Sequence, residues 1–172
     1  RSSAASDVYK RQVKTAGDNQ AAVFAAIPQE QRPIIVHQTG KDRDAPVREA
    51  YEKLGVKAEV VPFINDMAAR YEDCDVVICR AGASTLSELT ALGVPAILVP
   101  SPNVTNHHQE KNAALLGDHG AALVLAEEGL DGKKLFAAAA GILNDPQRME
   151  AMSKSMAALG IPDATKRIYD TV

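Results

Sequence analysis

Short apolar runs rich in β-branched residues alternate with helix-forming segments along most of the chain. Each run is continuously apolar rather than alternating with polar residues, which is typical of strands that helices cover on both faces. The pattern predicts strands at residues 33–37, 57–62, 75–79, 95–100 and 121–125. It predicts helices at residues 17–27, 45–54, 65–72, 85–92, 106–116, 130–143 and 146–159.

Residues that favour helix ends support these boundaries. Gly55 and Gly93 follow two predicted helices and suit C-cap positions, and Asn65 suits the N-cap of the helix at 65–72. Regular alternation of strand and helix predicts an α/β fold with a doubly wound, Rossmann-like parallel sheet. Right-handed crossovers bring the loops that follow the strands to one edge, where such folds bind ligands. These loops are residues 38–40, 63–66, 80–85 and 101–108.

Composition narrows the class of protein. A length of 172 residues with 46% hydrophobic residues suits one domain, and an aromatic content of 4% without Trp means an aliphatic core. The net charge of −3 without a basic stripe argues against a nucleic-acid partner. Apolar runs such as 95–100 are too short to cross a bilayer. Cys74 and Cys79 match no zinc or redox spacing.

The chain divides into a core segment and two ends. Residues 1–12 lack apolar periodicity and do not begin with Met, so we expect a non-native scar there, with a genuine flexible terminus as the alternative. Residues 13–160 form the predicted domain, and residues 161–172 a tail helix.

The segment at residues 75–88 is the most informative, because it predicts a buried strand, a small-residue loop and a helix start. Gly82 and Ala83 let a ligand approach the backbone, and the N-terminus of a helix offers unpaired N–H groups with partial positive charge. Glu88 follows one turn later, and a carboxylate can accept from both hydroxyls of a ribose. A nucleotide-linked ligand is therefore the first hypothesis.

A structural interpretation of the same residues stays open. Thr85 and Glu88 have the spacing of a capping box, in which the Glu88 side chain reaches back to the helix start. Ser84 could cap the helix instead.

Other polar groups fall on the same predicted edge. Ile64 could face a flat base, or it could belong to the core. Gln109 and Asn112 share a helix face and could bind sugar hydroxyls. His107 and His108 are adjacent on a helix and do not converge, so no metal site is expected there.

Residues 79–88, Cys-Arg-Ala-Gly-Ala-Ser-Thr-Leu-Ser-Glu, resemble a signature of the MurG family of peptidoglycan GlcNAc transferases. The resemblance is to the C-terminal half of that family and runs from about residue 19 to the end of the chain. It implies one half of a GT-B fold, the half that holds UDP-GlcNAc. Supporting stretches are residues 35–41, 63–67, 99–102, 106–113 and 162–164.

The resemblance also implies roles for individual residues. The residue matching Ile64 contacts uracil, those matching residues 83–87 surround the diphosphate and sugar, Glu88 holds the ribose, and Gln109 contacts the GlcNAc hydroxyls. It thereby favours a double role for Glu88, at the helix start and on the ribose. The predicted UDP-GlcNAc contacts are Ile64, Arg80, Gly82, Ala83, Ser84, Thr85, Leu86, Ser87, Glu88, Gln109 and Asn112.

The implied reaction is an inverting transfer of GlcNAc from UDP to the C4 hydroxyl of lipid-linked MurNAc-pentapeptide. It implies no metal and no cofactor. The implied location is cytoplasmic, with the complete protein peripheral on the cytoplasmic face of the membrane. The dipole of the helix at 85–92 would stabilise the departing diphosphate.

Two departures from the family pattern limit this expectation. The family's GGSxGA loop should precede Asn19, but residues 10–15 do not match it, so donor affinity should be reduced. In the family, a preceding N-terminal half binds the lipid acceptor, contacts the membrane and supplies the candidate base. We therefore expect donor binding but no turnover from these residues alone, and the catalytic residues stay unknown.

Other functions remain open for such a domain. The alternatives are another GT-B glycosyltransferase, a UDP-GlcNAc 2-epimerase, the donor-binding subunit of a split enzyme like the eukaryotic dolichol-linked GlcNAc transferase, and a plain α/β nucleotide-binding module.

We predict that the Glu88→Gln protein folds normally but loses most of its nucleotide affinity. Gln also serves at the third position of a capping box, whereas a neutral amide is a poorer acceptor for a ribose diol. Circular dichroism and nucleotide titration of both proteins measure the two effects. Unchanged binding would leave Glu88 with a capping role alone.

Overall fold

The computed structural model describes residues 33–161, without the side chains of Thr105 and Lys133. The scar predicted at 1–12, the helix at 17–27 and residues 162–172 of the tail lie outside the described residues. The strands are β1 (Ile35–Gln38), β2 (Ala58–Val61), β3 (Val77–Cys79), β4 (Ala96–Leu98) and β5 (Ala122–Val124). The helices are α2 (Asp44–Lys53), α3 (Met67–Glu72), α4 (Ala83–Leu92), the 3₁₀ turn η2 (Thr105–His107), α5 (His108–Asp118), α6 (Gly132–Leu143) and α7 (Pro146–Ala158).

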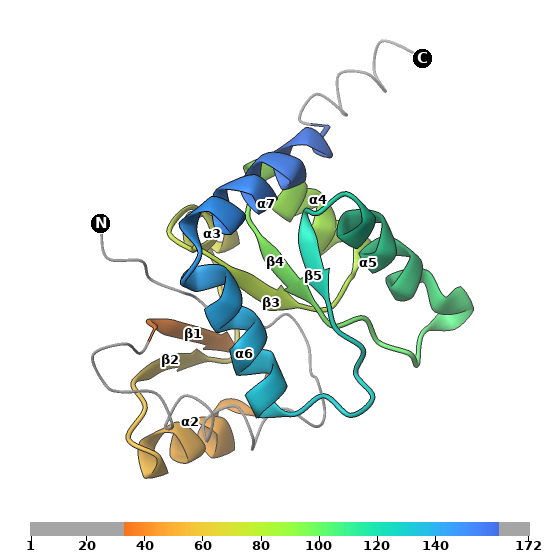
Figure 1. Cartoon of the computed structure of the whole chain (residues 1–172). Coiled ribbons are helices and arrows are strands. Elements are labelled where there is room, and N and C mark those ends of the chain that lie inside the picture. The colour runs from red at the N-terminus through yellow and green to blue at the C-terminus, as the bar shows by residue number, and fades with distance from the viewer. Residues whose placement is uncertain (1–32, 162–172) are drawn as a thin grey trace.

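All described strand pairs are parallel, which confirms the α/β class with helices as crossovers. Their hydrogen bonds form two separate sheets, β1–β2 and β3–β4–β5, rather than the single continuous sheet that the sequence predicts (Figure 1). Val36 of β1 and Val77 of β3 belong to one cluster of buried side chains, so the two sheets share a core.

Helices cover both faces of the β3–β4–β5 sheet, and strand periodicity assigns each side chain to its face. Val77, Cys79 and Leu98 pack in a cluster with side chains from α3, α4 and α5. The strand residues that point to the opposite face, such as Ile78 and Ile97, pack instead against α6 and the first half of α7 (Figure 1). Burial on both faces explains why these strands are continuously apolar.

Five of the six predicted helix starts within the described residues differ from the structure by one or two residues, and the starts of α3 and α5 show why. Asp66, not Asn65, caps α3, because its carboxylate accepts from the Ala69 N–H at 3.0 Å. The helix predicted to begin at Asn106 begins at His108, since Asn106 and His107 have φ values of 57° and 50°. Asn often adopts such left-handed backbone, and here the residue turns the chain before α5.

Helix α7 holds the end of α4 in place. Gly93 ends α4 with φ 67°, a conformation that favours glycine. Ser153 of α7 donates a 2.7 Å hydrogen bond to the Gly93 carbonyl. A Cβ atom on Gly93 would lie 3.2 Å from the Ala157 Cβ, so α7 packs closely against this turn.

We predict that Leu89→Ala lowers the free energy of unfolding by about 2–5 kcal/mol, as expected for an aliphatic side chain removed from a core. Leu89 is fully buried on α4, with 0% exposure. Leu92→Ala on the same helix is the matched control, because Leu92 is 43% exposed, and its effect should be under about 1 kcal/mol. Urea unfolding of both variants measures the difference. Equal losses would contradict the assigned packing face of α4.

Candidate functional site

The loop after β3 turns directly into α4, two residues earlier than the sequence suggests. Gly82 is the N-cap residue with extended backbone (φ −74°, ψ 138°), and α4 begins at Ala83. Thr85 therefore lies inside the first turn and is buried. The capping box of Thr85 and Glu88 is wrong, and so is a Ser84 cap, because no side chain caps this helix.

An uncapped helix start leaves its first N–H groups without an intrahelical acceptor. These are the N–H groups of Ala83, Ser84 and Thr85, since the first helical bond runs from the Leu86 N–H to the Gly82 carbonyl at 3.0 Å. Ala83 and Ser84 are exposed. A Cβ atom on Gly82 would meet no atom of residues 33–161 within 4 Å. The positive end of α4 is thus open to an incoming anion.

Glu88 lies in the second turn of α4 and is half-buried. Its neighbour is Tyr71 of α3, whose ring is buried in the core. Burial, followed by the negative charge of Glu88, raises the pKa of the Tyr71 phenol well above its usual range. Glu88 thus lies beside Tyr71, and it is too far along α4 to form a capping box with the Gly82 N-cap.

Arg80 contacts protein groups, and its predicted contact with a ligand stays a prediction. Its guanidinium donates to both carboxylate oxygens of Glu127 at 2.7 and 3.0 Å and to the Val99 carbonyl at 3.1 Å. The two side chains are only 11% and 18% exposed. A buried bidentate pair of this kind is strongly oriented, so Arg80 connects the ends of β3 and β4 to the loop after β5.

The two amides of α5 face the same loops, as their spacing predicts. Gln109 accepts a hydrogen bond from the Ser101 N–H at 2.9 Å. Asn112 donates to the Ala81 carbonyl at 3.2 Å. Both side chains therefore position main chain at the carboxyl edge of the sheet, and each keeps further hydrogen-bonding capacity.

Ile64 proves to be a core residue. Its side chain is 6% exposed and packs in the same cluster as Val36 and Tyr71, so it cannot offer an apolar face to a base. Its N–H donates to the Gln38 side chain at 2.9 Å. Contact between Ile64 and a base would therefore have to use the main chain.

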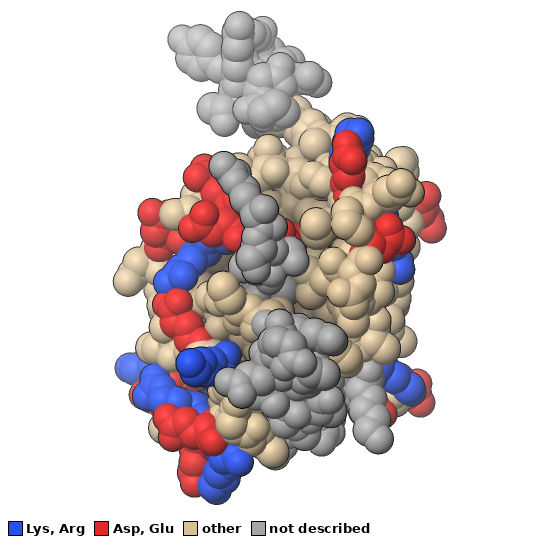
Figure 2. All heavy atoms as spheres, turned by 60° about the vertical axis from the view of Figure 1, so that its left-hand side comes forward, with Lys and Arg blue, Asp and Glu red and all other residues tan. Residues whose placement is uncertain are grey.

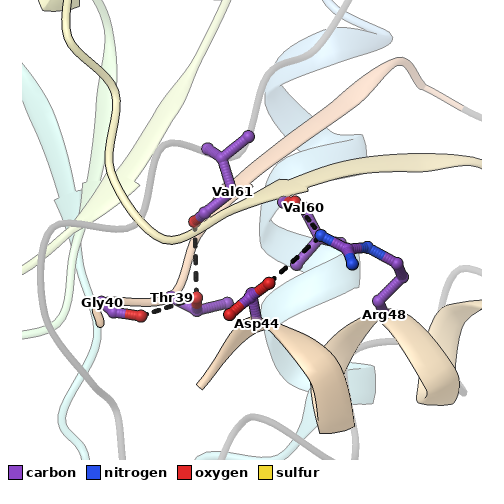
Figure 3. Close-up of polar contacts among 6 residues, drawn as sticks. All are labelled: Thr39, Gly40, Asp44, Arg48, Val60 and Val61. Atoms are coloured by element: carbon purple, nitrogen blue, oxygen red, sulfur yellow. Dashed lines mark hydrogen bonds and ion pairs between the residues drawn. The ribbon is translucent and has the colours of Figure 1, made fainter. Parts of the chain in front are cut away.

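The loop after β1 forms one wall of a pocket at this edge. The Thr39 hydroxyl donates to the Val61 carbonyl at 3.4 Å and to the Gly40 carbonyl at 3.1 Å, while Arg48 joins Asp44 to the end of β2 (Figure 3). These bonds fix the loop at the end of β1.

The pocket has a volume of about 500 Å³ and gathers residues from three separate loops. Thr39 and Lys41 follow β1, Arg80 follows β3, and Ser101 follows β4. Gln109 lines it as well, whereas Gly82 and Glu88 do not. The pocket thereby confirms the prediction for three of the four post-strand loops, and the hydrogen bond from the Ile64 N–H to the Gln38 side chain joins the fourth to the end of β1.

Sequence reasoning missed Glu127, Tyr71 and Gln38. Glu127 adjoins Glu128 in a stretch that reads as a solvated loop, and only the fold brings it to Arg80. Gln38 had a usable signal, because a polar residue directly after an apolar strand lies at the ligand-binding edge. Tyr71 is a core position of a short helix and gives no local signal of its neighbour Glu88.

Charge and hydropathy of the described residues add two observations. Lys and Arg side chains alternate with Asp and Glu over the face seen in Figure 2. Between residues 33 and 161, no helix is long and apolar enough to cross a membrane, and no three His, Cys, Asp or Glu side chains converge as metal ligands would.

Comparison with known proteins relates this geometry to a family. Residues 3–168 match the family described as the glycosyltransferase family 28 C-terminal domain. A relative from Thiobacillus denitrificans, the UDP-N-acetylglucosamine--N-acetylmuramyl-(pentapeptide) pyrophosphoryl-undecaprenol N-acetylglucosamine transferase, is 46% identical over 147 residues. That match covers 86% of this chain and 40% of the relative, so the chain spans less than half the length of such proteins.

Solved structures agree with this result. The structure of Acinetobacter baumannii MurG matches with a TM-score of 0.79 and 26% identity, over 98% of this chain and 52% of that one. The UDP-GlcNAc 2-epimerase of Neisseria meningitidis, bound to UDP-GlcNAc, matches with a TM-score of 0.71 at 12% identity, over 99% of this chain and 44% of that one, which shows a shared fold alone.

The parallel α/β architecture is therefore the Rossmann-like C-terminal half of a GT-B glycosyltransferase. The chain belongs to the glycosyltransferase family 28 C-terminal domain family. The resemblance carried by residues 79–88 is thus confirmed at the level of the family.

We predict that His37 makes the free energy of unfolding depend on pH. His37 is 5% exposed, with its Nδ1 3.3 Å from the Tyr51 hydroxyl, and burial lowers its pKa from 6.5 to about 4. Between these values the unfolded chain binds more protons, so stability falls as pH drops from about 6.5 to 4, by up to about 3 kcal/mol. Urea unfolding across this range should give a shallower slope for His37→Gln. The exposed His119→Gln variant is the control, and equal slopes in all three proteins would contradict the prediction.

Proposed function

We propose that this domain binds UDP-GlcNAc as the donor half of an inverting glycosyltransferase. The transferase would add GlcNAc to lipid-linked MurNAc-pentapeptide in peptidoglycan synthesis. The observation that supports the proposal most is the uncapped N-terminus of α4, which opens onto the space beside Gly82. The names of the curated relatives supply the sugar and the acceptor.

In this proposal the diphosphate lies against the N–H groups of residues 83–85. A helix N-terminus supplies several donors and about half a positive charge, and it requires no reorganisation when charge develops on the leaving diphosphate. Glu88 accepts hydrogen bonds from the ribose, and the main chain of Ile64 contacts the base. Ser87 lies on the same helix as Glu88, and Leu86 anchors that helix in the core.

The two α5 amides complete the donor site. Gln109 and Asn112 keep free hydrogen-bonding capacity after their contacts to Ser101 and Ala81. Gln109 lines the pocket of about 500 Å³, which is wide enough for a sugar. We assign it to the GlcNAc hydroxyls.

The acceptor and the membrane belong to a further part of the enzyme in this proposal. The curated relatives are more than twice as long as the matched segment. The proposed division of labour is that this half holds the donor, and another half holds the lipid-linked acceptor at the cytoplasmic face of the membrane. The 172-residue chain alone should then bind the donor without transferring its sugar.

We predict that UDP-GlcNAc binds the purified chain and that Glu88→Gln weakens this binding roughly tenfold or more, since hydrogen bonds to charged groups contribute about 1.5–3 kcal/mol. Isothermal titration calorimetry measures both affinities. Glu150→Gln on α7 is the matched control, because Glu150 carries the same charge but pairs with the exposed Lys154.

Titration with UDP-glucose and UDP-galactose distinguishes the sugar, and an assay with lipid-linked acceptor tests for transfer. Weaker binding of both alternative donors is expected. Failure of the wild-type chain to bind any UDP-sugar would refute the donor assignment, and transfer by this chain alone would refute the division of labour. Formation of the 2-epimer of the sugar would favour the epimerase alternative.

A further inference from the structure

We propose that Glu127 is a positioning residue for the diphosphate, acting through Arg80 and not by touching the ligand. The inference rests on the proposed donor site and adds a residue to it. It also replaces the direct ligand contact that the sequence predicts for Arg80.

The first step is the connection that this pair makes. Arg80 directly follows β3 and stands two residues before the Gly82 cap of α4. Its guanidinium holds the Val99 carbonyl after β4 and both oxygens of Glu127 after β5. One side chain therefore joins the carboxyl ends of three neighbouring strands. It does so where the loop of residues 80–82, between β3 and α4, begins.

The second step is that the same loop is held from its other side. Asn112 of α5 donates to the Ala81 carbonyl at 3.2 Å, and Ala81 is fully buried. The backbone between β3 and α4 is thus fixed by Arg80 at one residue and by Asn112 at the next. Donors fixed before binding hold an anion better than donors that must be ordered by it.

Arg80 and Glu127 form an ion pair of opposite charges. Both members of the pair are largely buried, with exposures of 11% and 18%, so the Glu127 carboxylate neutralises the Arg80 cation at short range. Attraction of a diphosphate is then left to the main-chain dipoles of α4. The role of Arg80 depends on its planar fork, which Lys cannot reproduce.

Two hypotheses for Arg80 give opposite results in Glu127→Gln. If Arg80 touches the diphosphate, loss of the Glu127 charge releases a cation, and UDP affinity stays the same or increases. If Arg80 positions the loop, the oriented pair is weakened and UDP affinity falls. The affinity for uridine, which has no phosphate, should stay within about twofold, by the usual near-additivity of separate contacts.

The experiment is calorimetric titration of the chain with UDP and with uridine. We expect Glu127→Gln and Arg80→Lys each to weaken UDP binding roughly tenfold, the size of effect typical of residues that orient a binding group. Glu128→Gln is the matched control, since Glu128 is the exposed neighbour of Glu127 in the same loop and changes the net charge equally. It should leave UDP affinity unchanged.

Each result has a distinct meaning. Failure of the wild-type chain to bind UDP refutes the proposed function, whereas normal wild-type binding with unchanged or tighter binding by Glu127→Gln refutes only the positioning role. An equal loss of UDP and uridine affinity would show a general structural effect and would also overturn it. If both Glu127→Gln and Arg80→Lys fail to fold by circular dichroism, the pair is a determinant of the fold, and the positioning role is rejected.

Discussion

The burial of α4 against β3 and β4 is the constraint on which the candidate site depends. Leu86 and Leu89 pack into the cluster that contains Val77 and Leu98, so the axis of α4 is fixed relative to the strands. The N-terminus of the helix must then emerge at the carboxyl edge of the sheet. Tight packing allows little freedom in this geometry. The three main-chain N–H groups of residues 83–85 therefore share one direction.

A second layer of interactions converts this edge into a defined surface. The Arg80 and Glu127 pair, the Asn112 amide and the Gln109 amide each bind main chain rather than one another. The loops after the strands are thereby ordered by groups from elements far away in the chain. Arg80 and Gln109 also line the pocket, so the side chains that order the loops are partly the same ones that face the open space.

Sequence reasoning identified the architecture well and the ends of the elements less well. Continuous apolar runs are a direct consequence of burial on both faces. Strands such as β3 and β4 could therefore be predicted from the apolar pattern of the sequence alone. The start of α4 could not, since Thr85 looks like a cap locally and its burial, to 6% exposure, appears only in the folded chain. Likewise Asn106 and His107 have ordinary helix-start composition, and their left-handed backbone is imposed by the turn into α5.

The local geometry of the candidate site could be predicted where it depends on the backbone, and could not be predicted where it depends on tertiary pairing. Small residues at 82 and 83 indicate an open helix start from spacing alone. Arg80 gives no sign in the sequence that its partner is Glu127, because 47 residues separate them and the loop around Glu127 looks solvated. Ile64 could be either core or site from the sequence, and its 6% exposure shows that its side chain is core, while a contact through its main chain stays a prediction.

The empty space around Gly82 has a consequence for how this domain tolerates sequence change. Its φ of −74° is open to L-amino acids, and an added Cβ would meet no atom within 4 Å in the part of the chain that the structure describes. Folding therefore imposes no requirement for glycine at this position, in contrast to Gly93, where the left-handed backbone does. Selection for glycine at residue 82 would therefore act through ligand binding and not through folding. Substitutions at both glycines, tested for their effect on stability, would separate the two kinds of requirement without a ligand.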